Sequence, residues 1–165
     1  MDGVTLTGMP EPFPVPIGLR LNQAARAVGR AFDKALEDAG GTLPVWLILL
    51  NLKIRKPGPQ RELADAVGIT EATLTHHLNA MDAEGLITRA RDTANRRIQV
   101  VTLTEKGDQV FQALAAAARA FDTKLRAGLA DTDLATLENL LGRLSANAGA
   151  PVGDGPPWSG LAGSH

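Results

Sequence analysis

The seven residues from position 91 to 97, RDTANRR, carry the most distinctive side-chain chemistry of the sequence. They include three arginines and one aspartate, and almost nothing that could join a hydrophobic core. The arginine guanidinium is permanently charged, donates several hydrogen bonds and is weakly hydrated. Such groups suit phosphate oxygens and the narrow minor groove of DNA. Taken alone, the stretch favours the alternative of a charged turn exposed to solvent.

A second group of hydrogen-bonding side chains precedes the arginines, in the segment 70–85 (TEATLTHHLNAMDAEG). As a helix of about 100° per residue, the segment places Leu74, Leu78 and Met81 on one face. The opposite face is small and polar, and it carries Ala72, Thr73, Thr75, His76, Asn79 and Ala83. Small side chains let a helix approach DNA closely, while hydroxyl, amide and imidazole groups can reach base edges or phosphates. An ordinary amphipathic helix with a polar outer face is the alternative.

The elements that position these side chains follow from the apolar spacing and from helix start and stop signals. Apolar residues recur at helical spacing from Ile17 to Leu36, and Gly40-Gly41 ends that helix. Thr42 caps a second helix, which closes before Pro57. Further helices are expected at 60–67, at 70–85, at about 105–128 and at 131–147, with Thr104 and Asp131 as caps of the last two. The segments 86–90 and 96–103 have strand character and flank the arginine loop.

A short helix, a Gly-Ile-Thr turn, a longer helix and a two-stranded ribbon follow one another in the order of a winged helix-turn-helix. The sequence therefore predicts an α+β fold that is mostly α. Three parts are expected: a proline-rich arm at 1–16, a folded domain at 17–147, and a flexible Gly/Pro-rich tail at 148–165.

Charge and cysteine content exclude several classes of protein. The 17 basic and 18 acidic residues nearly cancel, but the stretch 53–106 has 9 basic and 7 acidic residues, a net of +2, and the rest is net −3. Without cysteine, the chain has no disulfides and no thiolate metal sites. The start lacks the pattern of a signal peptide, and no apolar run approaches the ~20 residues of a membrane span. We therefore expect a cytoplasmic, nucleoid-associated protein without a membrane partner.

Two stretches of the sequence resemble the multiple antibiotic resistance regulator (MarR) family. They are GGTLPVWLILLNL (40–52) and QRELADAVGITEATLTHHLNAMDAEGLITRARDTANRRIQVVTLTEKG (60–107), and together they make up a little over a third of the chain. The most specific motifs are TLPxW, ELAxxxGI before TLT, EGLI, and RDxxxRRxxxVxLTxxG. The resemblance implies a homodimer held by N- and C-terminal dimerisation helices at 17–42 and 105–147. The lobe at 43–104 would place two recognition helices and two wings on the double-stranded DNA of a near-palindromic operator.

The resemblance also assigns roles by position. Thr73, Thr75 and His76 fall on the recognition helix, and Arg96 and Arg97 at the tip of the wing. Asp92 matches a wing aspartate that pairs with arginine and gives the wing its shape. His76 stands where many relatives carry arginine, and Asn95 where a second aspartate is common. The full set of expected DNA-binding residues is Thr70, Ala72, Thr73, Thr75, His76, Asn79, Arg89, Arg91, Arg96 and Arg97.

Members of the family often respond to small aromatic or phenolic compounds bound between the dimer helices and the DNA-binding lobe. In this chain the candidate lining is Trp46, Leu50 and Phe111, with Asn22 and Arg26 as polar contacts. The alternative is that Trp46 is only an anchor of the core. The resemblance implies a repressor released by such a ligand, although nothing in the residues themselves distinguishes repression from activation.

Metal binding and catalysis are not expected. His76 and His77 are adjacent, so as helix residues they point about 100° apart and cannot easily chelate one ion. No Gly-rich phosphate loop, HExxH motif or serine–histidine–acid spacing is present. We therefore expect no enzyme, no cofactor and no metal. A winged helix that binds another protein instead of DNA is the competing interpretation.

Overall fold

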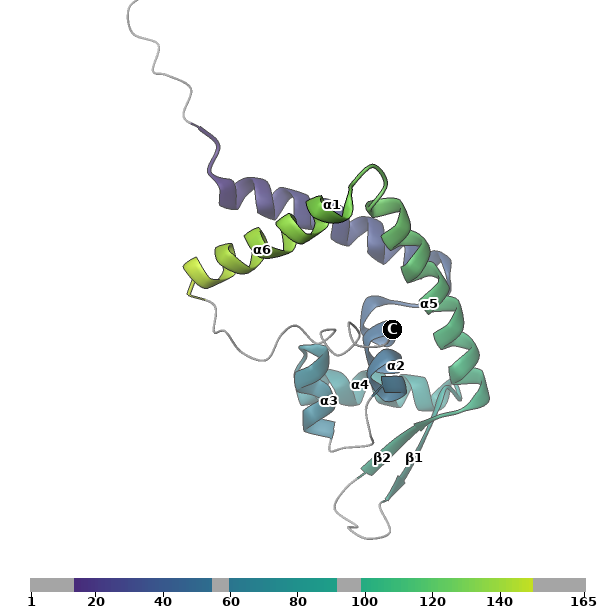
Figure 1. Cartoon of the computed structure of the whole chain (residues 1–165). Coiled ribbons are helices and arrows are strands. Elements are labelled where there is room, and N and C mark those ends of the chain that lie inside the picture. The colour runs from purple at the N-terminus through teal and green to yellow at the C-terminus, as the bar shows by residue number, and fades with distance from the viewer. Residues whose placement is uncertain (1–13, 55–59, 92–98, 150–165) are drawn as a thin grey trace, which may run out of the picture.

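The computed structural model describes residues 14–54, 60–91 and 99–149. Within these ranges the chain forms mostly helices and one two-stranded antiparallel sheet (Figure 1). In chain order the elements are α1 (Ile17–Asp38), α2 (Leu43–Ile54), α3 (Gln60–Val67), α4 (Glu71–Ala83), β1 (Ile87–Arg91), β2 (Gln99–Leu103), α5 (Glu105–Leu125) and α6 (Asp131–Asn147). The predicted class, α+β and mostly α, is confirmed.

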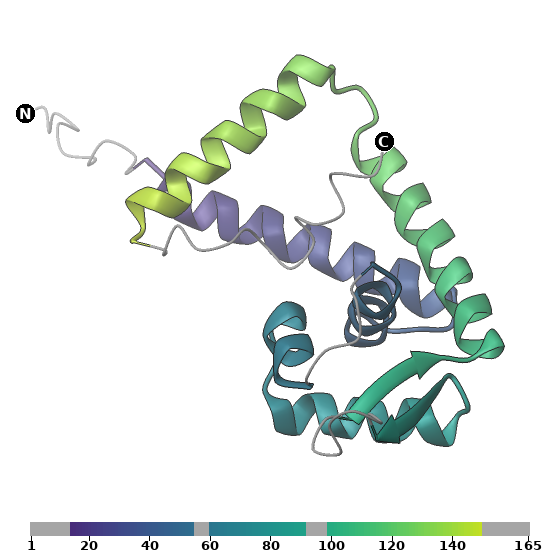
Figure 2. The same ribbon diagram turned by 60° about the horizontal axis from the view of Figure 1, so that its bottom comes forward.

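The elements separate into two regions. The helices α2, α3 and α4 and the β1–β2 ribbon gather at one end of the molecule, which we call the lobe (Figure 1). The helices α1 and α6 lie at the other end, and α5 runs from the ribbon up to them (Figure 2). A single continuous helix therefore joins the lobe to the opposite end.

One hydrophobic core holds the lobe to α1 and α5. Its fully buried leucines come from α1, α2, α4 and α5, and they are Leu36, Leu49, Leu74, Leu78 and Leu114. Each such side chain contributes about 1.5–3 kcal/mol by leaving water. Farther along, the rings of Phe32 on α1 and Phe121 on α5 meet at a centroid distance of 5.1 Å. The C-terminal half of α1 is thereby packed on α5.

Local signals set most of the element boundaries. Gly68 and Gly85 adopt φ of 78° and 70°, which glycine accommodates without strain, and they follow the ends of α3 and α4. Thr104 is the N-cap of α5, where its hydroxyl accepts from the Gly107 backbone N–H at 3.0 Å. These agree with the boundaries expected from the sequence. Helix α5 ends at Leu125, three residues before the expected bound, and residues 96–98 of the second predicted strand lie outside the described part.

The expected cap of α6 is wrong. Asp131 is the first helical residue, and the N-cap is Ala130. The backbone N–H of Ala130 donates to Oδ2 of Asp133 at 2.9 Å. A carboxylate three residues into the helix therefore reaches back and satisfies one backbone N–H at its N-terminus, while the side chain of Ala130 itself makes no capping hydrogen bond.

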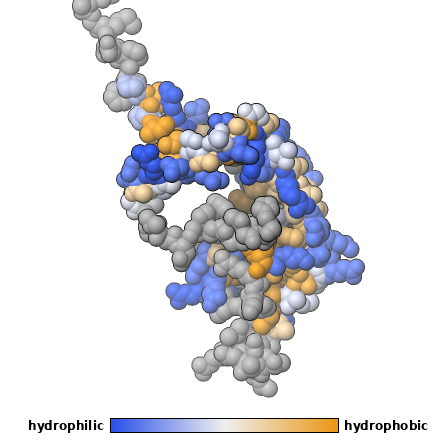
Figure 3. Space-filling model, in the orientation of Figure 1, coloured by the Kyte–Doolittle hydropathy of each residue, from blue (hydrophilic) through white to orange (hydrophobic). Residues whose placement is uncertain are grey.

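Two helices expose apolar side chains to solvent. On α1, Ile17 and Leu19 are 63% and 64% exposed, and hydrophobic colour marks this end of the helix in Figure 3. On α6, no residue is buried, and the exposed large side chains are Leu137, Leu140 and Leu141. Leu125, the last residue of α5, and Leu129, between α5 and α6, are exposed as well. Apolar surface gathered on neighbouring helices in this way is typical of a protein–protein contact.

The predicted division into arm, domain and tail is only partly covered by the described residues, which include 14–16 of the arm and 148–149 of the tail. Among the helices described, none combines the length and the apolar character that crossing a bilayer requires.

Candidate nucleic-acid interface

Helix α4 begins at a local hydrogen-bond network of two threonines. Thr70 is the N-cap, and its hydroxyl accepts from the Thr73 backbone N–H at 3.2 Å. The hydroxyls of Thr70 and Thr73 also share a hydrogen bond of 2.9 Å. Capping of this kind is worth about 1 kcal/mol. Both threonines therefore hold the start of the helix while remaining exposed at its surface.

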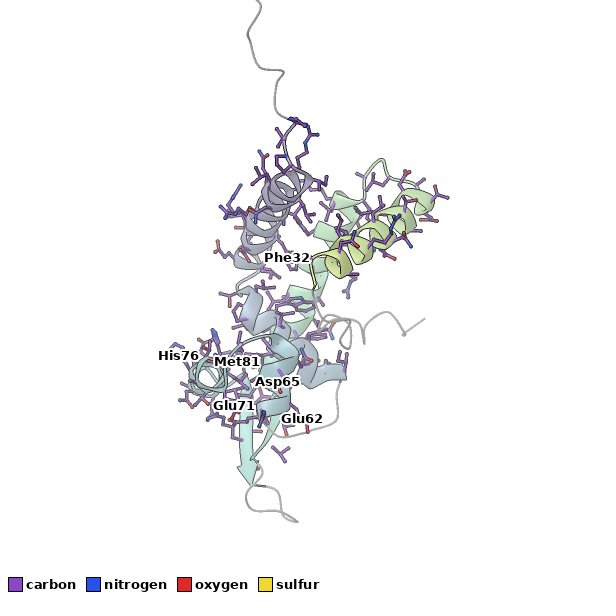
Figure 4. The ribbon with its side chains drawn as sticks, turned by 90° about the vertical axis from the view of Figure 1, so that its left-hand side faces the viewer. Phe32, Glu62, Asp65, Glu71, His76 and Met81 are labelled. Carbon is purple, nitrogen blue, oxygen red and sulfur yellow. The ribbon has the colours of Figure 1, made fainter. Side chains whose placement is uncertain are left out.

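The two faces of α4 are divided as the helical period predicts. Leu74, Leu78 and Met81 are buried and hold α4 to the lobe. The side chains exposed on the other face are Ala72, Thr73, Thr75, His76, Asn79 and Ala83. Figure 4 shows His76 projecting from α4 away from the other helices, whereas Met81 lies on their side. Apart from Glu71 in the first turn and Asp82 near the end of the helix, the exposed side chains of α4 are uncharged.

The hydroxyl group of Thr75 already donates a hydrogen bond within α4. It donates to the carbonyl oxygen of Glu71, one helical turn earlier, at 2.8 Å. The Thr75 oxygen keeps its capacity to accept. Thr75 is therefore suited to donor groups of DNA, which in the major groove are the amino groups of adenine and cytosine.

The ribbon turns one face toward α4 and the other toward solvent. Ile87 pairs with Leu103 and Arg89 with Val101 across the two strands. Ile87 and Val101 are buried, whereas Thr88, Ala90 and Thr102 are exposed. Because side chains alternate along a strand, Arg89 lies on the same inner face as Ile87.

Arg89 is hydrogen-bonded to the exposed face of α4. Its Nη1 donates to Oδ1 of Asn79 at 2.7 Å. The Arg89 side chain is half-buried, and its Nε and Nη2 are buried with no hydrogen-bond partner. In the described part of the chain no carboxylate lies within ion-pair distance of it. The pair thus joins two residues that were both expected to contact DNA, and it leaves a full positive charge beneath the α4 surface.

The first turn of α5 is fastened to the turn that joins α4 to β1. The Thr104 hydroxyl donates to the Gly85 carbonyl at 2.7 Å, and the Thr104 backbone N–H donates to the Leu86 carbonyl at 3.1 Å. Lys106 Nζ donates to the Glu84 carbonyl at 2.7 Å. Three consecutive carbonyls at the end of α4 are thereby bonded to α5. The recognition helix, the ribbon and α5 are therefore held together at one point.

The tip of the wing lies outside the described residues. This applies to Asp92, Arg96 and Arg97, whose expected roles stay predictions. Arg91 is the last residue of β1, and its side chain is likewise outside the description. The structure thus covers the base of the wing and the recognition helix.

The residues expected to line a ligand pocket fall into two groups. Trp46 and Phe111 stack with their ring centroids 5.6 Å apart and an interplanar angle of 14°, and Leu50 is buried in the same core. Asn22 and Arg26 lie on the exposed N-terminal half of α1 and do not belong to that core. The structure brings the three apolar candidates together and leaves the two polar ones apart from them.

A cation stands beside the aromatic stack instead. Lys53 Nζ lies 5.8 Å from the centroid of the Phe111 ring and forms an ion pair with Asp108. At this distance the ammonium group is attracted to the ring face. Lys53 is therefore a polar neighbour of the stack that the sequence did not suggest.

Within the described ranges, the two adjacent histidines form no metal site with other residues. Their ring centroids are 5.9 Å apart with the rings edge to face, His76 being exposed and His77 half-buried. The described residues contain no group of three or more His, Cys, Asp or Glu that could hold a metal ion.

Two features of this interface were not predicted from the sequence. The first is the Arg89–Asn79 hydrogen bond, although the period of two along β1 does place Arg89 on the face of buried Ile87. The second is the fastening of α5 through Lys106 and Gly107. Only its cap, Thr104, carried a signal, because the other contacts join segments about twenty residues apart.

Comparisons with known proteins agree with this architecture. Residues 42–99 match the model of the MarR family. A probable transcriptional regulator from Pseudomonas aeruginosa is 31% identical, with a TM-score of 0.67 over 79% of this chain and 97% of that one. The transcriptional regulator MosR of M. tuberculosis, solved in complex with DNA, is 25% identical, with a TM-score of 0.62 over 82% of this chain and 97% of that one.

A third structure shares the fold at lower identity. BpsR of Bordetella bronchiseptica, whose DNA binding is regulated by 6-hydroxynicotinic acid, is 23% identical, with a TM-score of 0.69 over 83% of this chain and 98% of that one. The family model covers α2, α3, α4 and β1 and ends at residue 99, where β2 begins, and the P. aeruginosa protein matches over 79% of the chain. The chain belongs to the MarR family of winged helix-turn-helix transcriptional regulators.

Proposed function

We propose that the chain is a sequence-specific transcriptional regulator that binds double-stranded DNA through α4 and the β1–β2 ribbon. The observation that carries this proposal is the Arg89–Asn79 hydrogen bond, which joins a helix face of mostly small, uncharged side chains to the base of an arginine-bearing wing. A helix of this kind fits the major groove, which is ~12 Å wide. The DNA complex of MosR, a relative at 25% identity, supports the same use of the fold.

The exposed apolar side chains of α1 and α6 support a homodimer as the binding form. Leu137, Leu140 and Leu141 are between 38% and 48% exposed on α6, and Ile17 and Leu19 are more exposed still on α1. A second copy of the chain would cover them and would present two recognition helices related by a twofold axis. Such an arrangement reads two half-sites spaced by one turn of DNA, which is why the operator is expected to be near-palindromic.

Selection from a pool of random duplexes tests this function. The full chain should enrich one inverted repeat, and it should bind that duplex with an affinity that falls as salt is added. Thr73→Asp, which puts a negative charge on the exposed face of α4, should abolish enrichment. The matched variant Thr123→Asp, on the exposed surface of α5, should not. If no duplex is retained at low ionic strength while another protein is, the winged helix serves protein–protein contact instead.

We propose further that the regulator is a repressor released by a small aromatic anion that binds beside Trp46 and Phe111. The support is the stack of the two rings with Lys53 at its edge, which offers an aromatic platform and a cation close together. Release from the selected duplex by an aromatic acid, with 6-hydroxynicotinic acid as the first probe, is the expected result. A matched Phe111→Leu variant should keep DNA binding and lose the response; release that is equal in both proteins would contradict this site.

As a DNA-binding regulator, the protein is expected to be non-enzymatic, to lie in the cytoplasm and to associate with the nucleoid. Its support is the family, whose relatives compared above are regulators, together with the nature of the partner, which is chromosomal DNA.

A further inference from the structure

The chemistry of the Arg89–Asn79 contact fixes how the Asn79 amide is turned. A guanidinium group carries only donors, so the atom that meets Nη1 at 2.7 Å must be the carbonyl oxygen Oδ1 and not the amide nitrogen. The oxygen end of the amide is therefore directed toward the ribbon. Asn79 itself is exposed, and within the described residues nothing accepts from its Nδ2 hydrogens.

The guanidinium also strengthens the donor that it leaves free. Arg89 has two further nitrogens that are buried without partners, and no carboxylate among the described residues neutralises it. A cation that donates to an amide oxygen polarises the amide and makes its N–H groups better donors. Asn79 therefore offers an outward –NH₂ group with a positive charge behind it, on the same face of α4 as His76 and Ala72.

This orientation restricts what Asn79 can read. Asparagine recognises adenine by two hydrogen bonds at once, accepting from the N6 amino group through Oδ1 and donating to N7 through Nδ2. The carbonyl oxygen has two lone pairs, but Arg89 takes one of them and turns the oxygen end of the amide toward the ribbon, so the donating half of that contact is the half that faces outward. The groups that match a lone donor are acceptor oxygens and nitrogens, namely O6 and N7 of guanine, O4 of thymine, or a phosphate oxygen.

We propose that Arg89 is a positioning residue that turns Asn79 into a donor-only contact, so that the recognition helix selects a hydrogen-bond acceptor on DNA at that point and does not read adenine. This inference rests on the proposed DNA-binding function and adds to it the chemistry of one contact. It also gives Arg89 a role at the recognition helix and not in the minor groove.

Selection from random duplexes with the full chain separates the outcomes. The wild-type chain should enrich guanine or thymine at one base pair of each half-site, and Asn79→Ala should flatten the preference at that pair alone, with an affinity loss of about threefold to tenfold. Arg89→Met, which removes the donor and frees Oδ1, should admit adenine at that pair. Arg89→Lys, whose ammonium group can still donate to Oδ1, should restore the wild-type preference.

The same experiment tells a base contact from a phosphate contact. If Asn79 meets a phosphate oxygen, Asn79→Ala and Arg89→Met weaken binding to every duplex by similar factors and change no preference, and Arg89→Lys restores the affinity. Either pattern supports the donor-only role. Two results would overturn the donor-only role. In the first, the wild-type chain prefers adenine and Asn79→Ala removes that preference. In the second, the preference depends on Asn79 but Arg89→Met leaves it unchanged.

Circular dichroism would show whether Arg89→Met folds. If it does not, a second variant still tests the proposal. Asn79→Asp keeps a partner for the guanidinium and replaces the outward donor by an acceptor. It should fold, keep dimerisation and lose the preference for guanine or thymine. If Asn79→Asp retains that preference, Asn79 is not the donor. Wild-type protein that retains no duplex at all would instead refute the proposed function, on which this inference depends.

Discussion

A Cβ atom added to Gly107 would stand 1.9 Å from the carbonyl oxygen of Leu86. The first turn of α5 therefore lies directly against the backbone at the end of the recognition helix, at the point where Thr104 and Lys106 hold the same turn. No side chain fits between them. The closeness is what allows three hydrogen bonds to join α5 to the α4–β1 turn.

Gly107→Ala should destabilise the protein by more than about 2 kcal/mol, because backbone atoms cannot yield to a methyl group as a flexible side chain can. Urea unfolding at a fixed protein concentration measures this. The matched control is Gly142→Ala in α6, where a Cβ meets nothing within 4 Å. That substitution should stabilise the helix by up to about 1 kcal/mol. Equal effects of the two variants would show that the contact at Leu86 is not tight in solution.

Asn79→Asp should raise stability and lower DNA affinity together. A carboxylate forms a charge-assisted hydrogen bond with Arg89, which exceeds the amide bond by about 0.5–1 kcal/mol at a half-buried site. The added negative charge faces the DNA phosphates and should weaken binding. In an Arg89→Met background the stabilisation should vanish, and this double-mutant cycle isolates the pair. A stability gain that persists without Arg89 would argue against the hydrogen bond as its cause.

Arg97→Ala should weaken binding to the selected duplex by about fivefold to tenfold and flatten its salt dependence, and Arg96→Ala should do so to a similar or lesser degree. Each phosphate contact that is lost lowers the slope of log affinity against log salt by about 0.9. Fluorescence anisotropy over a range of salt concentrations provides both numbers. Arg143→Ala, on the exposed surface of α6, is the control. Unchanged affinity and slope for both wing variants would remove the wing from the mechanism.

Leu137→Glu should convert the dimer to a monomer, because it places a charge in apolar surface that a second copy is expected to cover. Light scattering during size-exclusion chromatography reports the mass directly. Asn139→Glu adds the same charge to another exposed position of α6 and should leave the dimer intact. A Leu137→Glu protein that remains dimeric would place the interface elsewhere.

The boundaries of the elements could be predicted because they depend on neighbours in sequence. Thr70 and Thr104 accept from backbone N–H groups three residues ahead, and Gly68 and Gly85 stop helices by their own conformation. The one wrong cap follows the same physics. Asp133, three residues after Ala130, accepts from the Ala130 backbone N–H and holds the start of α6, where a cap by Asp131 was expected.

What could not be predicted depends on packing between distant segments. The period of two along β1 places Arg89 on the inner face of the ribbon. Its hydrogen bond with Asn79, however, also depends on the position at which α4 packs against the ribbon. In the same way, Trp46 and Phe111 come from α2 and α5, and their stack with Lys53 at its edge exists only once these helices have packed. The expected polar partners, Asn22 and Arg26, lie on the exposed N-terminal half of α1, and their role beside the stack stays a prediction, because sequence spacing does not report which end of α1 enters the core.

Helix α5 has 21 residues, which at 1.5 Å per residue make a rod of roughly 31 Å. The N-terminal end of α5 is hydrogen-bonded to the turn that follows the recognition helix α4. Toward the other end of α5, Phe121 packs against Phe32 of α1. Such a rod acts as a lever arm: a tilt of about 5° at the top displaces the bottom by roughly 3 Å. Since a hydrogen bond to a base edge fails over a shorter distance than that, a slight change in how two copies sit together would be enough to disengage the molecule from its operator.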